Sequence, residues 1–411
     1  MTLTFISNYI NHHQIPFCNA CYEMLGEDFC FIQTQPMEQE RIDMGWDADA
    51  KKIPYVRFLY EEEAACKEAV LSCDVLLAGW TDREDLIGQR LSSGKCTVRV
   101  SERPYREGQW KAISPKGLIR KYLDHTRYRK GEAYLLCAGA YVPSDFHIVR
   151  AYPGKMFRFG YFPETVTYSR EQWESLKPDS GCLNLVWAGR FIPLKHPEQM
   201  IALGKELLKR KELFGNDATN PFDDFRIHMV GSGEMEAELK AMAREAGLDG
   251  KMTFYGFQKP DEVRKIMEKS HIHIFTSNHL EGWGAVVNEA MNSGCAEVAN
   301  VQAGAVPYLV EHGKNGLVYP DANQEEMIKQ VLYLIENPAI RKEMGRSAYE
   351  TITGLWNAKH AAEAFIRFAE GLLEGKCVPE KEGPLSPAPV IAPRKMYAYV
   401  TKAGRKEKNN E

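Results

Sequence analysis

The 411-residue chain lacks any apolar run of the roughly 20 residues that a membrane span needs, and its first residues lack the basic and apolar segments of a signal peptide. It has little net charge, formally -4, which argues against bulk nucleic-acid binding. The cysteines stand singly, apart from Cys18 and Cys21, and we interpret this pair as neighbours on one helical turn rather than a redox or metal site. These absences predict a cytoplasmic protein with reduced, mostly buried thiols.

Short apolar runs alternate with amphipathic helical stretches along most of the chain. The runs typical of strands are 3–7, 29–33, 56–59, 75–78, 97–101, 134–137, 183–188, 225–230, 252–255 and 272–275. Helical patterns cover 17–25, 61–72, 83–91, 197–209, 234–246 and 261–269. This alternation predicts parallel sheets flanked by helices, and about twelve strands are too many for one small sheet.

We therefore predict two Rossmann-like domains, residues 1–165 and 166–355, separated near a polar stretch that interrupts the pattern. Residues 356–376 are predicted to form a helix that packs back towards the N-terminal domain. Residues 377–411 are rich in proline and basic near the end, which predicts a flexible or surface-draped extension. Ligands bind at the carboxyl ends of parallel strands, so two such domains facing each other would form a cleft between them.

The most informative local pattern places Glu281 and Glu289 on either side of a glycine-rich turn that follows an apolar strand. A strand, a glycine turn and a helix N-terminus together present backbone N–H groups to an anion. The two carboxylates would repel a phosphate, but they suit the hydroxyls of a sugar. The pattern therefore predicts a ligand that is part phosphate and part polyol, such as a nucleotide sugar.

Two cations follow the first strand of the second predicted domain. Gly189 lies at the strand end, Arg190 and Lys195 on the loop, and Pro197 where the next helix begins. Arg190 and Lys195 would stabilise a leaving diphosphate, whose negative charge grows as the glycosidic bond breaks. The alternative is a solvated pair that caps neighbouring carbonyl groups.

Two further strand ends carry glycine. Gly231 and Gly233 belong to an incomplete dinucleotide fingerprint, since Glu236 stands where a third small residue is required, and this favours a tight turn. Gly256 and Phe257 follow the next strand, where a glycine lets the backbone approach a flat base closely.

The order of these motifs, continued by residues 303–307 and 315–320, resembles glycosyltransferase family 4, the "group 1" domain of GT-B enzymes, over about residues 183–338. The resemblance implies an α/β GT-B fold: two facing Rossmann-like domains with parallel sheets and an interdomain cleft. It also implies a retaining, hexosyltransferase-type enzyme that needs no cofactor and no essential metal ion. Such an enzyme would move a sugar from a UDP- or GDP-sugar to a saccharide or lipid-linked acceptor in cell-surface polysaccharide synthesis.

By position, the resemblance assigns Glu281 to hydroxyls of the donor sugar, Glu289 to the ribose, and Arg190 and Lys195 to the diphosphate. The remaining donor-binding positions, which would act mainly through the backbone, are Gly189, Gly256, Phe257, Gly282, Trp283, Gly284 and Ala285. The chain departs from the family pattern at Ala296, Ala305 and Tyr308. These departures touch loop geometry, so they bear on the donor's identity rather than on the class.

The first domain offers weaker candidates for contact with the acceptor or the sugar. His12 and His13 lie on the loop where many members carry a glycine-rich turn, and Glu102 stands where many carry a histidine. The alternatives are surface or capping histidines, and a salt bridge from Glu102 to Arg103 or Arg106. Asp47-Ala-Asp49 matches a metal-binding D-x-D only superficially, and we interpret it as two nearby aspartates in a polar loop.

Residues 103–130 contain nine Lys or Arg against two acids, a balance of +7, with aromatic and aliphatic residues between them. Such a stretch predicts peripheral docking on an anionic membrane surface or a lipid-pyrophosphate acceptor. The alternative is a solvated helix with a core-facing apolar stripe.

Two other functions remain open for the whole chain. One is a GT-B-like protein that binds a nucleotide sugar and transfers nothing, although the intact set of Arg190, Lys195, Glu281 and Glu289 argues against decay of the site. The other is a nucleotide-sugar epimerase, which would need acid and base carboxylates around C2 of the sugar.

Overall fold

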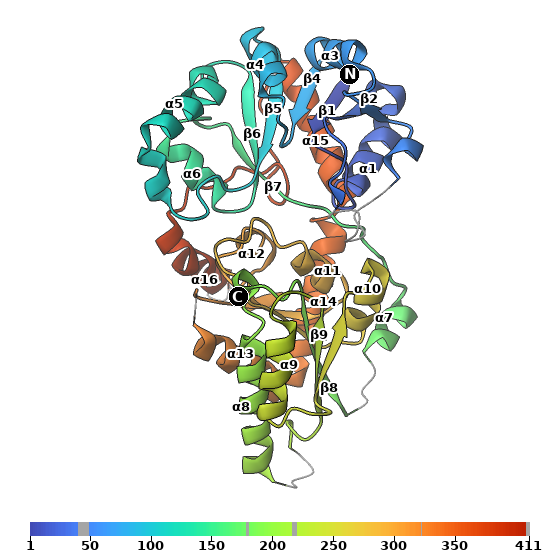
Figure 1. The fold of residues 1–411 in the computed structure, drawn as a ribbon, viewed down its shortest axis with the longest axis vertical. Coiled ribbons are helices and arrows are strands. Elements are labelled where there is room, and N and C mark those ends of the chain that lie inside the picture. Colours follow the sequence, from blue (N-terminus) through green and yellow to red (C-terminus); the bar gives the residue numbers. More distant parts are fainter. Residues whose placement is uncertain (40–48, 178–180, 216–219, 322, 408–411) are drawn as a thin grey trace. The chain divides into compact units, whose positions relative to one another are not determined.

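The computed structural model describes residues 1–39, 49–177, 181–215, 220–321 and 323–407, and these fold into two compact units (Figure 1). Unit 1 comprises Met1–Glu164 and Leu355–Pro393, and unit 2 comprises Thr165–Gly354 and Arg394–Glu411. The chain therefore passes from one unit to the other three times, after residues 164, 354 and 393.

Unit 1 is built on a parallel sheet of seven strands in the order β3-β2-β1-β4-β5-β6-β7. The strands are β1 (Leu3–Ser7), β2 (Phe29–Gln33), β3 (Val56–Phe58), β4 (Val75–Ala78), β5 (Thr97–Ser101), β6 (Ala133–Ala138) and β7 (Met156–Phe159). The helices are α1 (Ile15–Leu25), α3 (Glu63–Ser72), α4 (Glu84–Ser92), α5 (Pro115–Asp124), α6 (Val142–Ile148) and α15 (Ala358–Leu373). Every residue of β1 and β4 is buried, and β4 accordingly has a continuous apolar sequence, while β1 also buries Thr4 and Ser7.

The C-terminal part of unit 1 covers two of its surfaces. Helix α15 packs on α1, where the rings of Phe17 and Phe365 lie 6.1 Å apart. Beyond α15 the chain runs antiparallel to the edge strand β7: the Leu385 N–H donates to the Arg158 carbonyl, and the Arg158 N–H donates to the Ser386 carbonyl, each at 2.8 Å. This segment uses hydrogen-bonding groups that an edge strand would otherwise expose.

Unit 2 is built on a second parallel sheet, with six strands in the order β10-β9-β8-β11-β12-β13. The strands are β8 (Leu183–Ala188), β9 (Phe225–Val230), β10 (Met252–Gly256), β11 (Ile272–Phe275), β12 (Ala296–Asn300) and β13 (Gly316–Tyr319). The helices are α7 (Arg170–Leu176), α8 (Gln199–Phe214), α9 (Glu236–Glu245), α10 (Pro260–Glu268), α11 (Val286–Asn292), α12 (Val306–Leu309), α13 (Gln324–Glu336), α14 (Pro338–Gly354) and α16 (Met396–Glu407). Both units also contain short 3-10 helices. Those of unit 1 are η1 (Gly26–Asp28), η2 (Ala50–Lys52), η3 (Gln109–Ile113) and η4 (Thr126–Tyr128). Unit 2 contains η5 (Pro193–Lys195), and η6 (Pro393–Lys395) lies where the chain passes from unit 1 to unit 2.

The core of the second sheet contains one buried ion pair. His273 on β11 and Glu297 on β12 lie side by side in the strand register, with Nδ1 2.8 Å from Oε2 and neither side chain exposed. Burial raises the pKa of Glu297, and His273 opposes that shift. The pair satisfies a carboxylate that would otherwise be costly to bury.

Each of the ten apolar runs that predict strands is a strand in the structure, with ends within a residue of the expected ones. Cys18 and Cys21 lie buried on α1, and burial raises the pKa of both thiols, which fits their interpretation as helix-core residues. Across the described ranges, no helix combines the length and the apolar character needed to cross a membrane.

Candidate functional site

The strand order of unit 2 reverses between β8 and β11, which are neighbours in the sheet. Loops that leave adjacent strands in opposite directions open a crevice at the carboxyl edge, where ligands of open α/β sheets bind. The loop after β8 carries Arg190 and Lys195, and the loop after β11 carries Glu281. The sheet order therefore brings the predicted donor residues to a single edge of unit 2.

Lys195 and Glu281 form an ion pair between these two loops, with side chains 15% and 16% exposed. The backbone under Lys195 is fixed by Thr276, whose hydroxyl donates to the Lys195 carbonyl and accepts from Trp187 Nε1 at 2.7 Å. Asn278 braces the same contact, since its N–H donates to the Leu194 carbonyl at 3.0 Å. The ammonium group and the carboxylate are thus held in place and largely shielded from water.

His196 lies next to this pair and adds a second connection between the loops. Its backbone is left-handed, with φ 49°, and its Nε2 lies 3.0 Å from Asn278 Nδ2. Its Nδ1 lies 2.9 Å from Glu198 Oε1, and that hydrogen bond raises the pKa of His196. No sequence pattern pointed to His196, Thr276 or Asn278, because their importance depends on two loops that meet only in the folded sheet.

Arg190 differs from Lys195 in its surroundings. Its side chain is exposed, and its guanidinium has no hydrogen-bond or ion-pair partner among the residues that the structure describes. It directly follows Gly189, whose N–H donates to the Val230 carbonyl at 2.9 Å. A cation fixed at its backbone and unpaired at its tip is available to an anion.

The glycines after β9 are required by close backbone packing. Gly231 has φ +132°, and a Cβ atom there would overlap the carbonyl oxygen of Gly189. A Cβ atom at Gly233 would lie 2.5 Å from the carbonyl oxygen of Phe191. These contacts support the interpretation of a tight turn against that of a dinucleotide loop.

The turn before α11 presents backbone, while its largest side chain points inward. Trp283 is 1% exposed, and its indole N–H donates to Asn288 Oδ1 at 2.9 Å. The backbone carbonyl of Trp283 accepts from the Ala305 N–H at 3.0 Å. Gly284 has φ +96°, and a Cβ atom there would lie 2.7 Å from the Phe275 ring. Trp283 therefore fastens the turn to α11, and a ligand would meet the backbone of residues 282–285 rather than the indole.

The remaining donor candidates lie apart from the Lys195–Glu281 pair. Glu289 sits on α11, half-buried, and burial raises its pKa against the opposing influence of Arg264 and His273. Phe257 follows β10 with 53% of its surface exposed, beside Gly256 with φ +68°. In the described part of the chain, no hydrogen bond or ion pair joins Glu289 or Phe257 to that pair.

The candidates of unit 1 meet through a tyrosine that the sequence analysis did not single out. The Tyr161 hydroxyl donates to Glu102, and its ring stacks on His13 with centroids 5.8 Å apart. His12 packs against His13 at 3.8 Å, and burial together with His12 lowers the pKa of His13 to about 3. The loops after β1, β5 and β7 are thus joined at the carboxyl edge of this sheet.

Glu102 also pairs with Arg106, one of the two salt bridges considered from the sequence. Arg103 instead forms a buried ion pair with Asp145 at 3.2 Å. Of the two aspartates that match a D-x-D only superficially, Asp47 lies outside the described residues, and Asp49 pairs with Lys52 at 2.5 Å.

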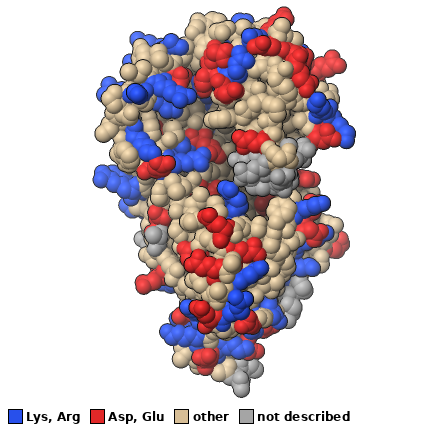
Figure 2. Space-filling view, in the orientation of Figure 1, with Lys and Arg blue, Asp and Glu red and all other residues tan. Residues whose placement is uncertain are grey.

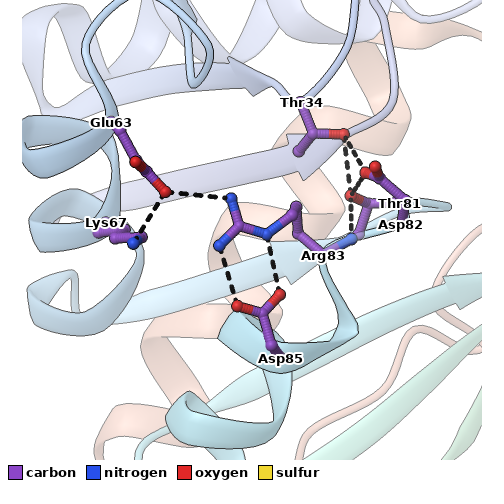
Figure 3. Close-up of polar contacts among 7 residues, drawn as sticks. All are labelled: Thr34, Glu63, Lys67, Thr81, Asp82, Arg83 and Asp85. Carbon is purple, nitrogen blue, oxygen red and sulfur yellow. Dashed lines mark hydrogen bonds and ion pairs between the residues drawn. The ribbon is translucent and has the colours of Figure 1, made fainter.

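A second polar cluster lies where β2 and β4 end (Figure 3). Thr34 Oγ1 lies 2.9 Å from Thr81 Oγ1 and 3.2 Å from Asp82 Oδ1, which ties the two strand ends together. Arg83 binds both carboxylate oxygens of Asp85 at 2.9 Å. The charge of Arg83 is compensated by Asp85, and the hydroxyl groups join the two strand ends, so we assign the cluster a structural role.

Trp80 stands directly before this cluster and is 66% exposed. Its carbonyl accepts from the Asn8 N–H at 2.7 Å, so it lies at the reversal of strand order between β1 and β4. An exposed indole at such an edge offers an apolar platform to a ligand. The sequence signal was available, since Gly79 and Trp80 directly follow a predicted strand.

Comparison with known proteins gives independent information on unit 2. Residues 170–351 match the family model described as "Glycosyl transferases group 1". An uncharacterized glycosyltransferase of Haemophilus influenzae is 35% identical over 123 residues, 30% of this chain and 34% of that protein. The lipopolysaccharide core biosynthesis glycosyltransferase LpsE of Rhizobium meliloti is 22% identical over 141 residues, 34% of this chain and 40% of LpsE. The matched segments thus span about a third to two fifths of these relatives.

Solved structures resemble more of the chain. HepE of Anabaena in complex with UDP superposes with a TM-score of 0.65 and 14% identity, covering 90% of this chain and 100% of HepE. At this identity the likeness concerns the fold alone. It confirms the predicted fold class, an α/β protein of the GT-B type with two parallel sheets.

Proposed function

We propose that this chain, whose residues 170–351 form a domain of the glycosyl transferases group 1 family, transfers a sugar from a nucleotide diphosphate sugar to a saccharide or lipid-linked acceptor. The observation that carries the proposal is the Lys195–Glu281 pair at the strand reversal of unit 2. It places a cation and a carboxylate side by side, which are the two groups that a sugar diphosphate needs. The name of LpsE supports an acceptor in cell-surface polysaccharide synthesis.

Donor binding would replace the ion pair by contacts to the ligand. The diphosphate takes over Lys195 and draws in the exposed Arg190, while the carboxylate of Glu281 accepts hydrogen bonds from sugar hydroxyls. Each charge is thus satisfied by its neighbour before binding and by the donor afterwards. Because both side chains are largely withdrawn from water, these contacts are stronger than they would be on an open surface.

The rest of the donor would extend along the same sheet edge. The backbone of residues 282–285 approaches the sugar and the phosphate oxygens, and Glu289 accepts hydrogen bonds from the ribose. Gly256 and Phe257, after β10, receive the base. The complex of HepE with UDP supports a uridine nucleotide as the first donor to test, followed by GDP-sugars.

The proposed reaction retains the configuration of the sugar. The bond from C1 to the β-phosphate oxygen breaks with its electron pair going to that oxygen, and the acceptor oxygen bonds C1 on the same face. The acceptor proton passes to the departing phosphate oxygen, so no separate protein base is needed. Lys195 and Arg190 stabilise the growing charge, the role that a divalent ion has in metal-dependent transferases, and we therefore expect activity without added metal.

The acceptor would bind at the carboxyl edge of unit 1. His12, His13 and Glu102 are joined there through Tyr161, and Trp80 offers an exposed ring. Polar groups beside an aromatic face suit a saccharide, whose faces are apolar and whose rim carries hydroxyls. In this proposal the sheet edge of unit 1 binds the acceptor and the sheet edge of unit 2 binds the donor.

A thermal-shift series with UDP-, GDP- and ADP-sugars tests donor binding first. A nucleotide sugar at a hundred times its Kd should stabilise the protein by about 2.7 kcal/mol. Incubation with an acceptor mixture then separates the functions: release of nucleotide diphosphate with a glycosylated product supports transfer. Binding without product would identify a nucleotide-sugar-binding protein, and a changed sugar without acceptor would identify an epimerase. The absence of any thermal shift would contradict the proposal.

A further inference from the structure

Helix α5 is the unusual helix of unit 1, because none of its residues is buried. The large apolar side chains of this helix and of η3 before it point to solvent, whereas Ala112 of η3 is buried in the core. They are Trp110, Ile113, Leu118, Ile119, Tyr122 and Leu123, with 43 to 76% of each exposed. We call these six residues the α5 surface. The alternative of a core-facing stripe, considered from the sequence, is therefore wrong for this segment.

The α5 surface rests on a fixed support at its N-terminal side. Asp145 on α6 is fully buried and pairs with Arg103. The same carboxylate accepts from the Tyr105 N–H at 3.0 Å and from Gln109 Nε2 at 2.8 Å. The start of η3 is thus tied to the body of unit 1, and the exposed side chains that follow are not those of a loose loop.

The C-terminal side is anchored as well. His125, directly after α5, is buried with its Nδ1 2.7 Å from the Tyr152 hydroxyl. The Thr126 hydroxyl donates to the Val149 carbonyl at 3.0 Å. Since both ends of the segment are held, the outward position of its apolar residues is a property of the fold.

The cations of this segment differ in whether their charge is compensated by an acid. Arg103, Arg106 and Lys111 pair with acids within unit 1 and contribute little net charge. The cations whose side chains remain exposed are Lys116, Arg120, Arg127, Arg129 and Lys130, and of these Arg120 also pairs with Asp124 at 3.5 Å. Figure 2 shows blue side chains gathered at the left of unit 1, on the side where Figure 1 labels α5. The exposed part of the segment is therefore apolar in the middle and basic around it.

We propose that the α5 surface docks on an anionic lipid surface. Its aliphatic and aromatic side chains enter the boundary between headgroups and acyl chains, and the five exposed cations contact the headgroups. Trp110 and Tyr122 suit this boundary because their rings are apolar and carry one polar tip. The excess of exposed cations favours an anionic lipid over a neutral one. The proposal does not depend on the proposed function.

Vesicle sedimentation with the full chain tests it. We expect recovery with vesicles of phosphatidylcholine and phosphatidylglycerol, little recovery with phosphatidylcholine alone, and a decrease as salt is raised. Replacing Trp110, Ile113 and Ile119 together by serine should abolish recovery. Lys116→Glu and Arg129→Glu should each lower the partition coefficient at least about fivefold.

Matched controls come from α8 of unit 2. Leu213→Ser removes an apolar side chain that is 73% exposed, and Lys205→Glu reverses an exposed cation, so both should sediment like the wild type. Equal recovery from both vesicle types, no recovery from either, or unchanged binding of the triple variant would each overturn the proposal. Sedimentation velocity tests whether a second copy of this chain covers the α5 surface instead of a membrane. A wild-type protein that is dimeric and does not bind vesicles, and that the triple substitution converts to a monomer, would identify such a contact between two copies.

Discussion

The side chains of Lys195 and Glu281, 86 positions apart in the sequence, form an ion pair where the strand order of the second sheet reverses. Each residue lies on a different βα loop, so their meeting depends on β8 and β11 being neighbours. In the proposed function, this contact is exchanged for contacts to the diphosphate and the sugar when the donor binds.

Replacing Lys195 by alanine should lower kcat by about 10²- to 10³-fold, the usual effect of losing one fixed donor to a developing anion. Donor affinity should change much less, because Arg190 and the backbone of the turn remain. Steady-state kinetics together with calorimetric donor binding separate the two effects. Lys205→Ala, an exposed lysine on α8, is the matched control. Turnover equal to the wild type would rule the role out.

Glu281→Gln should separate the recognition of the sugar from that of the nucleotide. The substitution keeps the shape of the side chain but removes the charge that pairs with Lys195. Affinity for the free nucleotide diphosphate should hold or rise, since Lys195 no longer has a competing carboxylate. Affinity for the nucleotide sugar should fall by about 10- to 100-fold through loss of charge-assisted hydrogen bonds. Parallel losses for both ligands would contradict the assignment of Glu281 to the sugar.

Gly231→Ala should destabilise the protein by more than about 2 kcal/mol, because the added Cβ atom overlaps a backbone carbonyl and the φ of +132° disfavours any side chain. Urea unfolding monitored by tryptophan fluorescence measures this loss of stability, which should appear as a lower midpoint for the unfolding of unit 2. Gly354→Ala is the control: it lies at the end of α14 with nothing within 4 Å of the added atom. That change should be neutral or stabilise by up to about 1 kcal/mol.

His13 should make unit 1 less stable as the pH falls. Its folded pKa of about 3 lies below the ordinary 6.5, so the unfolded chain binds more protons between these values. The resulting stabilisation is complete above pH 6.5 and is lost as the pH falls towards 3. His13→Phe keeps a ring for Tyr161 and removes the titration, so its melting temperature should depend less on pH between 7 and 4. Identical slopes for both proteins would mean that His13 is not held neutral.

The sequence predicted ten strands, several of which carry a charged residue such as Arg57 or Arg99, and it missed β7, β12 and β13. Strand β12 contains Glu297, whose buried carboxyl group is hydrogen-bonded to His273 on the neighbouring strand. No local pattern reveals such a pair, since its two members belong to different runs. Strand β7 was also missed, although the predicted β3 is shorter and likewise contains an arginine, and the backbone of Arg158 on β7 binds the C-terminal segment.

The candidate site was predictable to the extent that it follows strand ends. Arg190, Lys195 and Glu281 were found because glycine and charge follow apolar runs. Tyr161 was missed together with β7, the strand that precedes it. The burial of the Trp283 indole could not be inferred from the position of Trp283 in a glycine turn. Contacts between loops, such as those of Thr276 and Asn278, require the order of the strands, which the sequence pattern leaves open.

The three passages of the chain between its units have a practical consequence. Unit 1 is not one continuous piece: a fragment that ends at residue 164 would leave bare both the face of α1 that α15 covers and the edge of β7 that the later segment occupies. An exchange of unit 1 with that of a related chain must therefore move two separate stretches, 1–164 and 355–393, and rejoin them at three points. A swap at a single junction would produce a hybrid with an exposed apolar helix face, and it would fail by aggregation before its specificity could be measured.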